Sequence, residues 1–310
     1  MRSWAERRST QGIALITAML ITALASLVAI NLAWDNALDV RRTMVLMNRD
    51  QAIQVALGAE NLVVSVLHQD LEEGQTDHLS EFWAGDLPVF PIEGGEVYGS
   101  IEDAQGRFNV NNLVGEDGNV DNDALEQFRR LLNALGLDPR FAGITADWLD
   151  SNQDAEFPDG AEDPIYTAFT PPYRSANQAL TSVSELAAIE GMDKATLDTL
   201  LPHVIALPGR TNINVNTATA AVLQSLDENM SASDVEGLMS ERENGGFGDL
   251  QTAFASLVRP DVLNRLDEST DYFLFRVVVR IDTVRITLYT LLLRGPRGDV
   301  TPIMRSFGTT

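Results

Sequence analysis

The most strongly patterned part of the chain is its N-terminal stretch. The 22 residues Ile13–Trp34 read IALITAMLITALASLVAINLAW and include no charged side chain. As a helix rising about 1.5 Å per residue they would span roughly 33 Å, enough for the core of a bilayer. Beyond them, an apolar stripe recurs every three, four or seven residues. Its members are Leu38, Val45, Ala52, Val55, Leu62 and Val66.

This pattern predicts one helix of about 55 residues, with a transmembrane part (13–34) and an amphipathic stem (35–70). A stem of this length needs other elements to bury its stripe. Arg7 and Arg8 precede the apolar run, and Asp35 and Asp39 follow it. The excess of positive charge before the run predicts a cytoplasmic N-terminus and an exported C-terminal part. A cleaved secretory signal is the alternative, but its apolar region is shorter, about 7–15 residues.

Alternating apolar and polar positions return near the C-terminus and predict an antiparallel sheet. The expected strands are 96–103, 272–281, 284–294 and 300–305, with a hairpin turn at Asp282–Thr283. Residues 70–95 are expected to form a loop that packs Phe82 and Trp83 onto the stem. Helix-like stretches lie between the first strand and the others, and we expect Asp123 to cap the first of them. The expected helices are 124–135, 144–149, 182–189, 194–201, 217–226, 232–243 and 250–256.

These elements predict an α+β fold in which the stem packs on the sheet. Residues 71–111 and 212–310 would form the sheet domain, and 112–211 an inserted helical domain. Residues 212–257 resemble a helix-hairpin-helix and are assigned to the sheet domain. The position of the hairpin reads Asp227-Glu228-Asn229-Met230, without the glycines and basic neighbours that bind phosphates.

The overall charge narrows the possible partners. The 310 residues carry a formal net charge of −23, which argues against binding nucleic acid, because phosphates require a basic surface. There is no cysteine, so disulfides cannot stabilise an exported domain and thiol chemistry is excluded.

The densest chemical signal is an acidic loop at 146–163, ADWLDSNQDAEFPDGAED. It holds seven carboxylates, and there is no Lys or Arg between Arg140 and Arg174. Calcium, which takes six to eight oxygen ligands, would neutralise them. Asp150-x-Asn152-x-Asp154 has the spacing of the first three ligands of an EF-hand, but Ala155 and Ala161 stand where Gly and Glu are needed. The alternative is an acidic run facing water.

A second acidic spacing, Asp117-x-Asn119-x-Asp121-x-Asp123, is better explained by turn formation and helix capping. No nucleophile, phosphate-binding or dinucleotide-binding motif is present. The three histidines are not spaced as metal ligands, and we expect no enzymatic activity. Two alternative functions remain open: a membrane-anchored helix-hairpin-helix protein of DNA uptake and an anchored periplasmic hydrolase.

The leader, the stem and several internal segments together resemble one family. A basic leader ending at Gly12 and a charge-free helix continuing as a stem are similar to class III prepilin signals. The segments DALEQFRRLLNALGL, ADWLDSNQD, GAEDPIY and PPYRSANQALTSVSELAAIEGM resemble the K-type minor pseudopilins of type II secretion. The family implies a leader of residues 1–12, cleavage by a prepilin peptidase between Gly12 and Ile13, and methylation of Ile13. Thr17 stands where most prepilins have Glu, a departure expected of a subunit with nothing stacked above it.

The resemblance also implies partners, a location and a metal. It implies a pseudopilin fold at the tip of the pseudopilus, assembled with I- and J-type minor pseudopilins through the stem stripe. It implies an inner-membrane anchor, a periplasmic C-terminal domain and a position close to exported substrates. It implies one or two calcium ions in the loop 150–163. The ligands expected by position are Asp150, Asn152, Asp154, Glu162 and Asp163.

Overall fold

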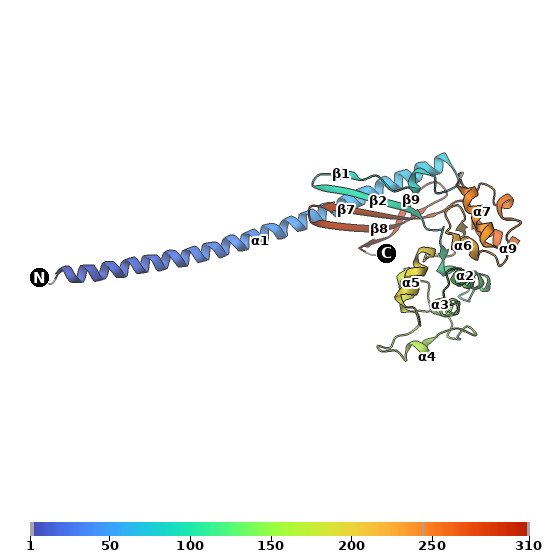
Figure 1. The fold of residues 1–310 in the computed structure, drawn as a ribbon, viewed down its shortest axis with the longest axis horizontal. Helices are drawn as coiled ribbons and strands as arrows, with labels where there is room; N and C mark the ends of the chain where they lie inside the picture. Colours follow the sequence, from blue (N-terminus) through green and yellow to red (C-terminus); the bar gives the residue numbers. More distant parts are fainter. Residues whose placement is uncertain (1–2, 244, 309–310) are drawn as a thin grey trace.

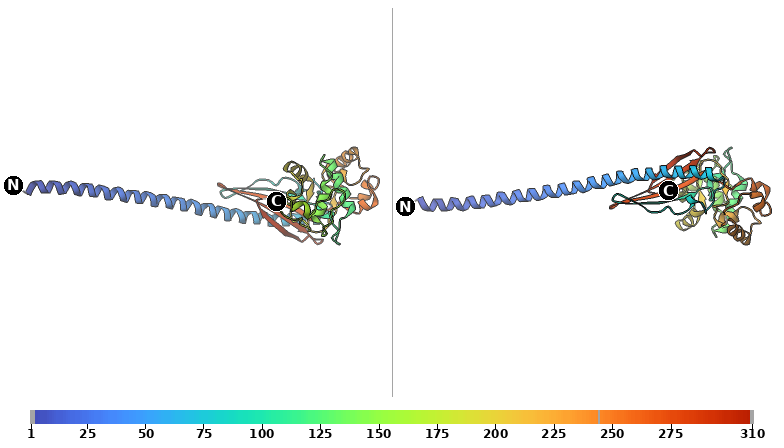
Figure 2. Two further views of the ribbon diagram at one scale, coloured as in Figure 1. Left: turned by 90° about the horizontal axis from the view of Figure 1, so that it is seen from below. Right: turned by 90° about the horizontal axis from the view of Figure 1, so that it is seen from above.

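One long helix carries the whole molecule. The structure, a computed structural model, describes residues 3–243 and 245–308. Helix α1 (Ser3–Glu73) has 71 residues and projects as a single rod from the globular part (Figures 1 and 2). It is longer than predicted, since it begins within the leader and continues to Glu73, and the N–H of the following Gly74 bonds to the Asp70 carbonyl. The leader's Met1 and Arg2 lie outside the described residues, as do the side chains of residues 3–11.

The C-terminal half of α1 packs on a five-stranded antiparallel sheet of order β1-β2-β7-β8-β9. The alternating patterns located β2, β7 and β8 correctly, and the hairpin turn lies at Asp282, where φ is +51°. The three-residue β1 was missed, because a short segment containing Pro91 in a Gly-rich stretch resembles a loop. The strands are β1 (Phe90–Ile92), β2 (Gly95–Asp103), β7 (Tyr272–Ile281), β8 (Val284–Arg294) and β9 (Val300–Phe307).

Alternate residues of the strands point toward α1 and form the first core. Phe273, Phe275 and Val277 of β7 are at most 1% exposed there. Trp83 joins this core as predicted, with its ring 5.1 Å from that of Phe273. Phe82 does not, because its side chain is 80% exposed. Only one of the two adjacent aromatic residues can face the core where they lie on a short 3₁₀ turn.

Glu60 corrects the sequence interpretation of the stem. It is not a member of the predicted apolar stripe, yet it is 2% exposed and faces the sheet. Thr290 Oγ1 donates to Glu60 at 2.8 Å, and the Arg305 guanidinium donates at 2.8 and 2.7 Å. Burial acts to raise the pKa of Glu60, but these hydrogen bonds outweigh it and hold the pKa below its usual value. The charge therefore fastens β9 to the stem.

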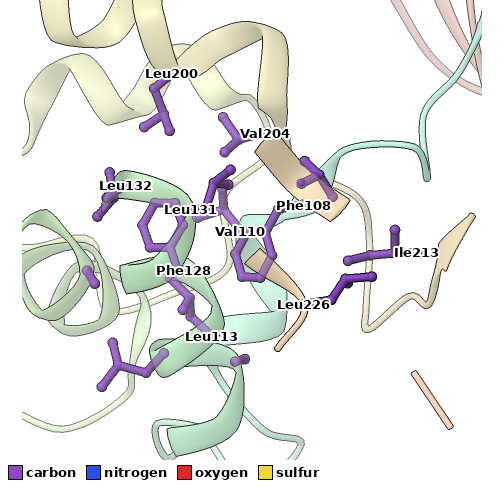
Figure 3. Packing of buried hydrophobic residues seen from close by; sticks show 14 of the residues in the cluster. Phe108, Val110, Leu113, Phe128, Leu131, Leu132, Leu200, Val204, Ile213 and Leu226 are labelled. Atoms are coloured by element: carbon purple, nitrogen blue, oxygen red, sulfur yellow. The ribbon is translucent and has the colours of Figure 1, made fainter. Parts of the chain in front are cut away.

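The second core belongs to a helical domain beyond the far end of the sheet (Figure 1). Figure 3 shows its centre, where the rings of Phe108 and Phe128 stack with centroids 5.2 Å apart. Its helices are α2 (Asn122–Ala134), α3 (Phe141–Leu149), α4 (Asp163–Tyr166), α5 (Lys194–Leu200), α6 (Ala220–Ser225), α7 (Ala232–Arg242), α8 (Leu250–Phe254) and α9 (Pro260–Leu263). Two short parallel strand pairs connect its parts: β3 (Phe108–Asn109) with β4 (Val204–Ile205), and β5 (Ile213–Asn214) with β6 (Leu266–Asp267).

Two expectations about this domain were wrong. The helix-hairpin-helix-like segment 212–257 shares the helical core instead of the sheet core, because buried residues from Ile213 to Phe254 contact the residues of α2 and α3. The first helix is capped by Asp121, which accepts hydrogen bonds from the backbone N–H groups of Asp123 and Ala124. Asp123 instead pairs with Arg265 at 2.7 Å. Both acids were available as caps, and a contact distant in sequence decided between them.

Candidate functional site

The acidic loop lies at the C-terminal end of α3, the most completely buried helix of the helical domain. Asp147 and Asp150, at the end of this helix, are 0% and 1% exposed, and Glu162 is 3% exposed. Asp154, in contrast, is exposed to solvent. The loop is therefore not simply a solvated acidic run: three of its carboxylates are held inside the protein.

Hydrogen bonds fold the first part of the loop into tight turns. Asp150 accepts from the Asn152 backbone N–H at 3.3 Å and from its Nδ2 at 2.7 Å. Asn152 Oδ1 accepts from the Asp154 N–H at 2.6 Å. Asp147 accepts from the Glu156 N–H at 3.0 Å. The backbone turns closely around Asp147, since a Cβ on Gly160 would lie 2.1 Å from its carboxylate. Glycine is therefore required at that position.

The second part of the loop brings Glu162 and Asp163 together on one residue. Ser175 Oγ donates to Glu162 at 2.9 Å and lies 3.2 Å from Asp163 Oδ1. The nearest cation is Arg174, 80% exposed and 3.6 Å from Asp163. An exposed pair of this kind contributes little. The buried carboxylates therefore have no strong cationic partner among the described residues.

Because these carboxylates are buried without a strong cationic partner, their pKa values are raised. Burial, and then the charges of Glu162 and Asp150, raise the pKa of Asp147 to about 7. Burial also raises the pKa of Asp150, with further contributions from Glu156 and Asp154. The pKa of Glu162 is raised by burial and by the charges of Asp150 and Asp163. Each of these carboxylates makes ionisation of its neighbours more costly, which a bound cation would reverse.

Two buried oxygens, one in the loop and one beside it, are of the kind that binds a cation. Among the described residues, Glu162 Oε1 and Asn177 Oδ1 are buried without a hydrogen-bond partner. Asn177 adopts a positive φ of 46°, and its Nδ2 donates to the Asn152 carbonyl at 2.6 Å. It therefore borders the first part of the loop. Such buried acceptors normally find a partner, and carboxylate and amide oxygens are calcium's preferred ligands.

The predicted stem stripe divides into two groups. Ala52 is fully buried against the sheet, and Val55 and Val66 are half-buried beside it. Leu38 is half-buried, whereas Val45 and Leu62 are 47% and 58% exposed. Farther toward the N-terminus every apolar side chain of 13–34 is exposed. Ile13 is 63% exposed, and Thr17 Oγ1 donates to the Ala14 carbonyl at 3.0 Å. This is the one described helix long and apolar enough to span a membrane.

The comparisons with known proteins now decide the family. Two models of the type II secretion system protein K family match residues 106–209 and 213–266. A type II secretion system protein K of Pseudomonas aeruginosa is 35% identical over 97% of this chain and 94% of its own length. The chain belongs to the type II secretion system protein K family. Another member, from Klebsiella pneumoniae, is 38% identical over 70% of each chain.

A solved structure supports the same assignment. In the GspK–GspI–GspJ complex of enterotoxigenic Escherichia coli, one chain matches this structure with a TM-score of 0.77 and 25% identity. The match covers 87% of this chain and all of the other. The long helix, antiparallel sheet and helical domain are thus confirmed as the fold of this protein K. Its role is that of a minor pseudopilin in type II secretion, and the N-terminal apolar helix is its membrane anchor.

Other acidic groups of this protein K already have cations. Asp121, in the second acidic spacing, pairs with Arg210 and lies 3.6 Å from Arg265. Asp227, at the predicted hairpin, is buried and pairs with Arg259 at 3.1 Å. Both carboxylates are held as structural ion pairs, which distinguishes them from the acidic loop.

One further cluster of carboxylates has no signal in the sequence. Among the described residues, one set of three carboxylates has oxygens all within 4.8 Å of one another: Asp70, Asp77 and Glu81. Its cation is Arg294, which is 3% exposed. The acidic loop does not meet that criterion, so a metal there would also need amide and backbone oxygens. Residues 70, 77, 81 and 294 share no local motif, and no pattern in the sequence could have joined them.

Proposed function

We propose that this protein K is the tip subunit of the type II pseudopilus and starts or caps its assembly. The placement of the helical domain carries the proposal. It lies at the end of the molecule opposite the N-terminus of α1, so that it extends the fibre axis (Figures 1 and 2). A subunit stacked above it would need that space. Thr17 supports the same position, because a subunit with nothing above it needs no Glu there to pair with a neighbour's N-terminus.

The partners proposed are the I- and J-type minor pseudopilins, as in the complex of the Escherichia coli relative. Their stems would meet the part of α1 that the sheet leaves open. Val45 and Leu62 remain exposed and are the best contacts, whereas Ala52 has no surface left to offer. Burying exposed apolar side chains would stabilise the assembly by about 25 cal/mol per Å².

Cysteine cross-linking tests this arrangement, since the natural chain has no cysteine. We expect Leu62→Cys and Val45→Cys, each in the full chain, to form disulfides with I- and J-type subunits carrying one stem cysteine. Ser256→Cys, exposed on the helical domain, is the matched control and should stay unlinked. Equal cross-linking at Ser256, measured on non-reducing gels of co-produced subunits, would place partners on the helical domain and refute the tip arrangement.

We also propose that a prepilin peptidase cuts after Gly12 and that Ile13 becomes a methylated N-terminus. A Cβ at Gly12 would meet nothing within 4 Å, so Gly12→Leu leaves the folded protein unstrained. The expected result is a full-length, unprocessed chain that stays in the inner membrane and supports little or no secretion. Intact-mass measurement checks this. Ala14→Leu is the control, and if Gly12→Leu is processed like it, the cleavage site lies elsewhere.

We further propose a membrane topology and a calcium site for this protein K. The N-terminus would lie in the cytoplasm and the sheet and helical domains in the periplasm, because basic residues precede the span and acids follow it. One or two calcium ions would be held in the loop 150–163 by Asp150, Asn152, Asp154, Glu162 and Asp163. The ion would compensate the buried carboxylates and rigidify the helical domain in a chain without disulfides.

A further inference from the structure

The sheet has a second face that α1 does not cover. Residues at every second position of β7 point away from the helix, and their cross-strand neighbours on β8 point the same way. We call this the open face. Its members on the two central strands pair in register as Leu274 with Leu291, Arg276 with Tyr289, Val278 with Thr287, and Arg280 with Arg285.

One end of the open face meets the helical domain in an apolar corner. Ile205 and Leu207, after α5, pack against Leu291 there. Beside this contact lies a cavity of about 250 Å³, with Leu274 and Tyr289 on the sheet side. Val183, Leu201 and Ile205 line it from the helical domain. Figure 1 shows α5 on the side of the sheet away from α1. The corner is large enough for one apolar side chain of a partner.

Beyond the corner, the open face carries Arg276, Arg280 and Arg285 against one carboxylate, Glu96, in a chain whose net charge is −23. Within the described residues, Arg276 and Arg285 have no carboxylate within 4.0 Å. Arg280 contacts Glu96 at 3.0 Å and stands directly opposite Arg285 in the register. Like charges directly across two strands are destabilising. The Arg280 and Arg285 side chains therefore repel each other across the strands, and a bound anion would relieve that repulsion.

The distance from the membrane argues against lipid head groups as that anion. The helix leaves the apolar run at Trp34 and first meets the sheet at Ala52. Those 18 residues correspond to roughly 27 Å of helix, about three Debye lengths at physiological salt. Lipid charge is screened over that distance. An acidic protein segment can reach the face in the periplasm.

We propose that the open face docks an extended acidic segment of another protein. An apolar side chain of that segment enters the corner cavity, and the segment then runs along β7. At about 3.4 Å per residue, carboxylates two and six positions beyond the anchor fall near Arg276 and near the Arg280–Arg285 pair. Arginine binds carboxylates with paired, charge-assisted hydrogen bonds. This surface is separate from the stem contacts and leaves them free for other pseudopilins.

The probe is a fluorescein-labelled synthetic peptide that carries one Phe and, two and six positions after it, Glu. It is titrated by fluorescence anisotropy against the full-length chain in detergent. We expect the double variant Arg276→Gln/Arg285→Gln to bind about tenfold more weakly, with less dependence on salt. Leu274→Gln should weaken binding while preserving the salt dependence. The control Arg297→Gln removes an exposed arginine outside the open face and should bind like the natural protein.

Three results would overturn the proposal. One is a peptide that fails to bind the natural chain. Another is equal weakening by the control and by the double variant. The third is equal binding of heparin or of a scrambled peptide, which would show a general attraction to polyanions. Circular dichroism and thermal unfolding of every variant separate a loss of binding from a loss of folding.

Discussion

Calcium at a hundredfold excess over its dissociation constant should raise the free energy of unfolding of the full chain by about 2.7 kcal/mol. The physical reason is the acidic loop, whose buried Asp147, Asp150 and Glu162 lack a strong cation. Magnesium should give a smaller effect, because it requires a tight octahedral shell and gives up its water reluctantly. Thermal unfolding in detergent, with chelator and then with each metal, measures both effects.

The variant Glu162→Gln separates a metal ligand from a merely structural carboxylate. Without calcium it should be as stable as the natural chain or more stable, since it removes a charge that repels Asp150. With calcium it should gain little, because one ligand is lost. Glu228→Gln, an exposed acid of the same domain, is the control and should keep the full response. A calcium response that survives in Glu162→Gln would rule Glu162 out as a ligand.

The raised pKa of Asp147 determines how the stability of the folded chain changes with pH. The pKa of Asp147 is raised to about 7, above its value in the unfolded chain. The folded state therefore binds more protons than the unfolded state between about pH 4 and 7, and without calcium stability falls as pH rises through that window. Calcium binds the ionised form, so its stabilising effect should grow over the same window. Unfolding curves at several pH values, with and without calcium, would show the two trends diverging.

The sheet was predictable because its sequence signals are local. In β7 and β8 an apolar residue recurs at every second position, and Asp282 tolerates the positive φ that the tight turn requires. No tertiary contact is needed to locate such a hairpin. The acidic loop was also visible in the sequence, as a charge imbalance without nearby Lys or Arg. Its burial was not visible, because charge runs usually face water.

The sequence predictions that were wrong have one physical cause. Contacts between residues distant in sequence select one of two locally equivalent residues. Asp121 and Asp123 are both suited to cap α2, but Asp123 forms an ion pair with Arg265 instead. Phe82 and Trp83 are both large and apolar, and Phe273 provides a site for the tryptophan. Glu60 looks like a surface acid until Thr290 and Arg305, 230 and 245 residues away, are brought to it. These contacts form only in the assembled fold, so no periodic pattern in the sequence predicts them.

Replacing Arg294 by methionine should cost about 3–5 kcal/mol of unfolding free energy, the typical cost of leaving a buried charge without its partner. Arg294 donates to Asp70 at 3.0 Å, to the Thr270 carbonyl at 2.9 Å and to Asp77. Its guanidinium also lies 4.7 Å from the centre of the Phe273 ring. Methionine keeps much of the packing volume, so the loss reports mainly on the charge. Arg297→Met is the control and should change stability little, because Arg297 is exposed.

The pH dependence of this loss identifies its cause. Burial, followed by the charges of Glu81 and Asp77, raises the pKa of Asp70 to about 6, and burial raises that of Asp77. Without Arg294 these pKa values rise further, and the folded variant must either keep its protons or bury bare charges. Its stability should therefore fall more steeply than that of the natural chain as pH rises through 6. A deficit independent of pH would point to lost packing instead.

The second variant of this test is Asp77→Asn, alone and combined with Arg294→Met. Asparagine preserves the shape at the position where the Thr270 N–H donates to Asp77. If the cost comes from an uncompensated carboxylate, the double variant should be more stable than Arg294→Met, and the cycle should give a coupling energy of about 0.5–3 kcal/mol. Additive effects would mean that Asp77 is not the charge that Arg294 compensates.

The position of this cluster explains why its loss should also impair secretion. Asp70 belongs to the last turn of α1, and Arg294 ends β8. The backbone of Asp77 bonds to Glu268 and to the side chain of Asn214, both in the segments that carry the helical domain. Stem, sheet and helical domain thus meet at one arginine, and in the proposed tip position a growing fibre would push the helical domain through this junction. Arg294→Met should therefore reduce secretion at temperatures where the isolated chain is still folded, and Arg297→Met should not.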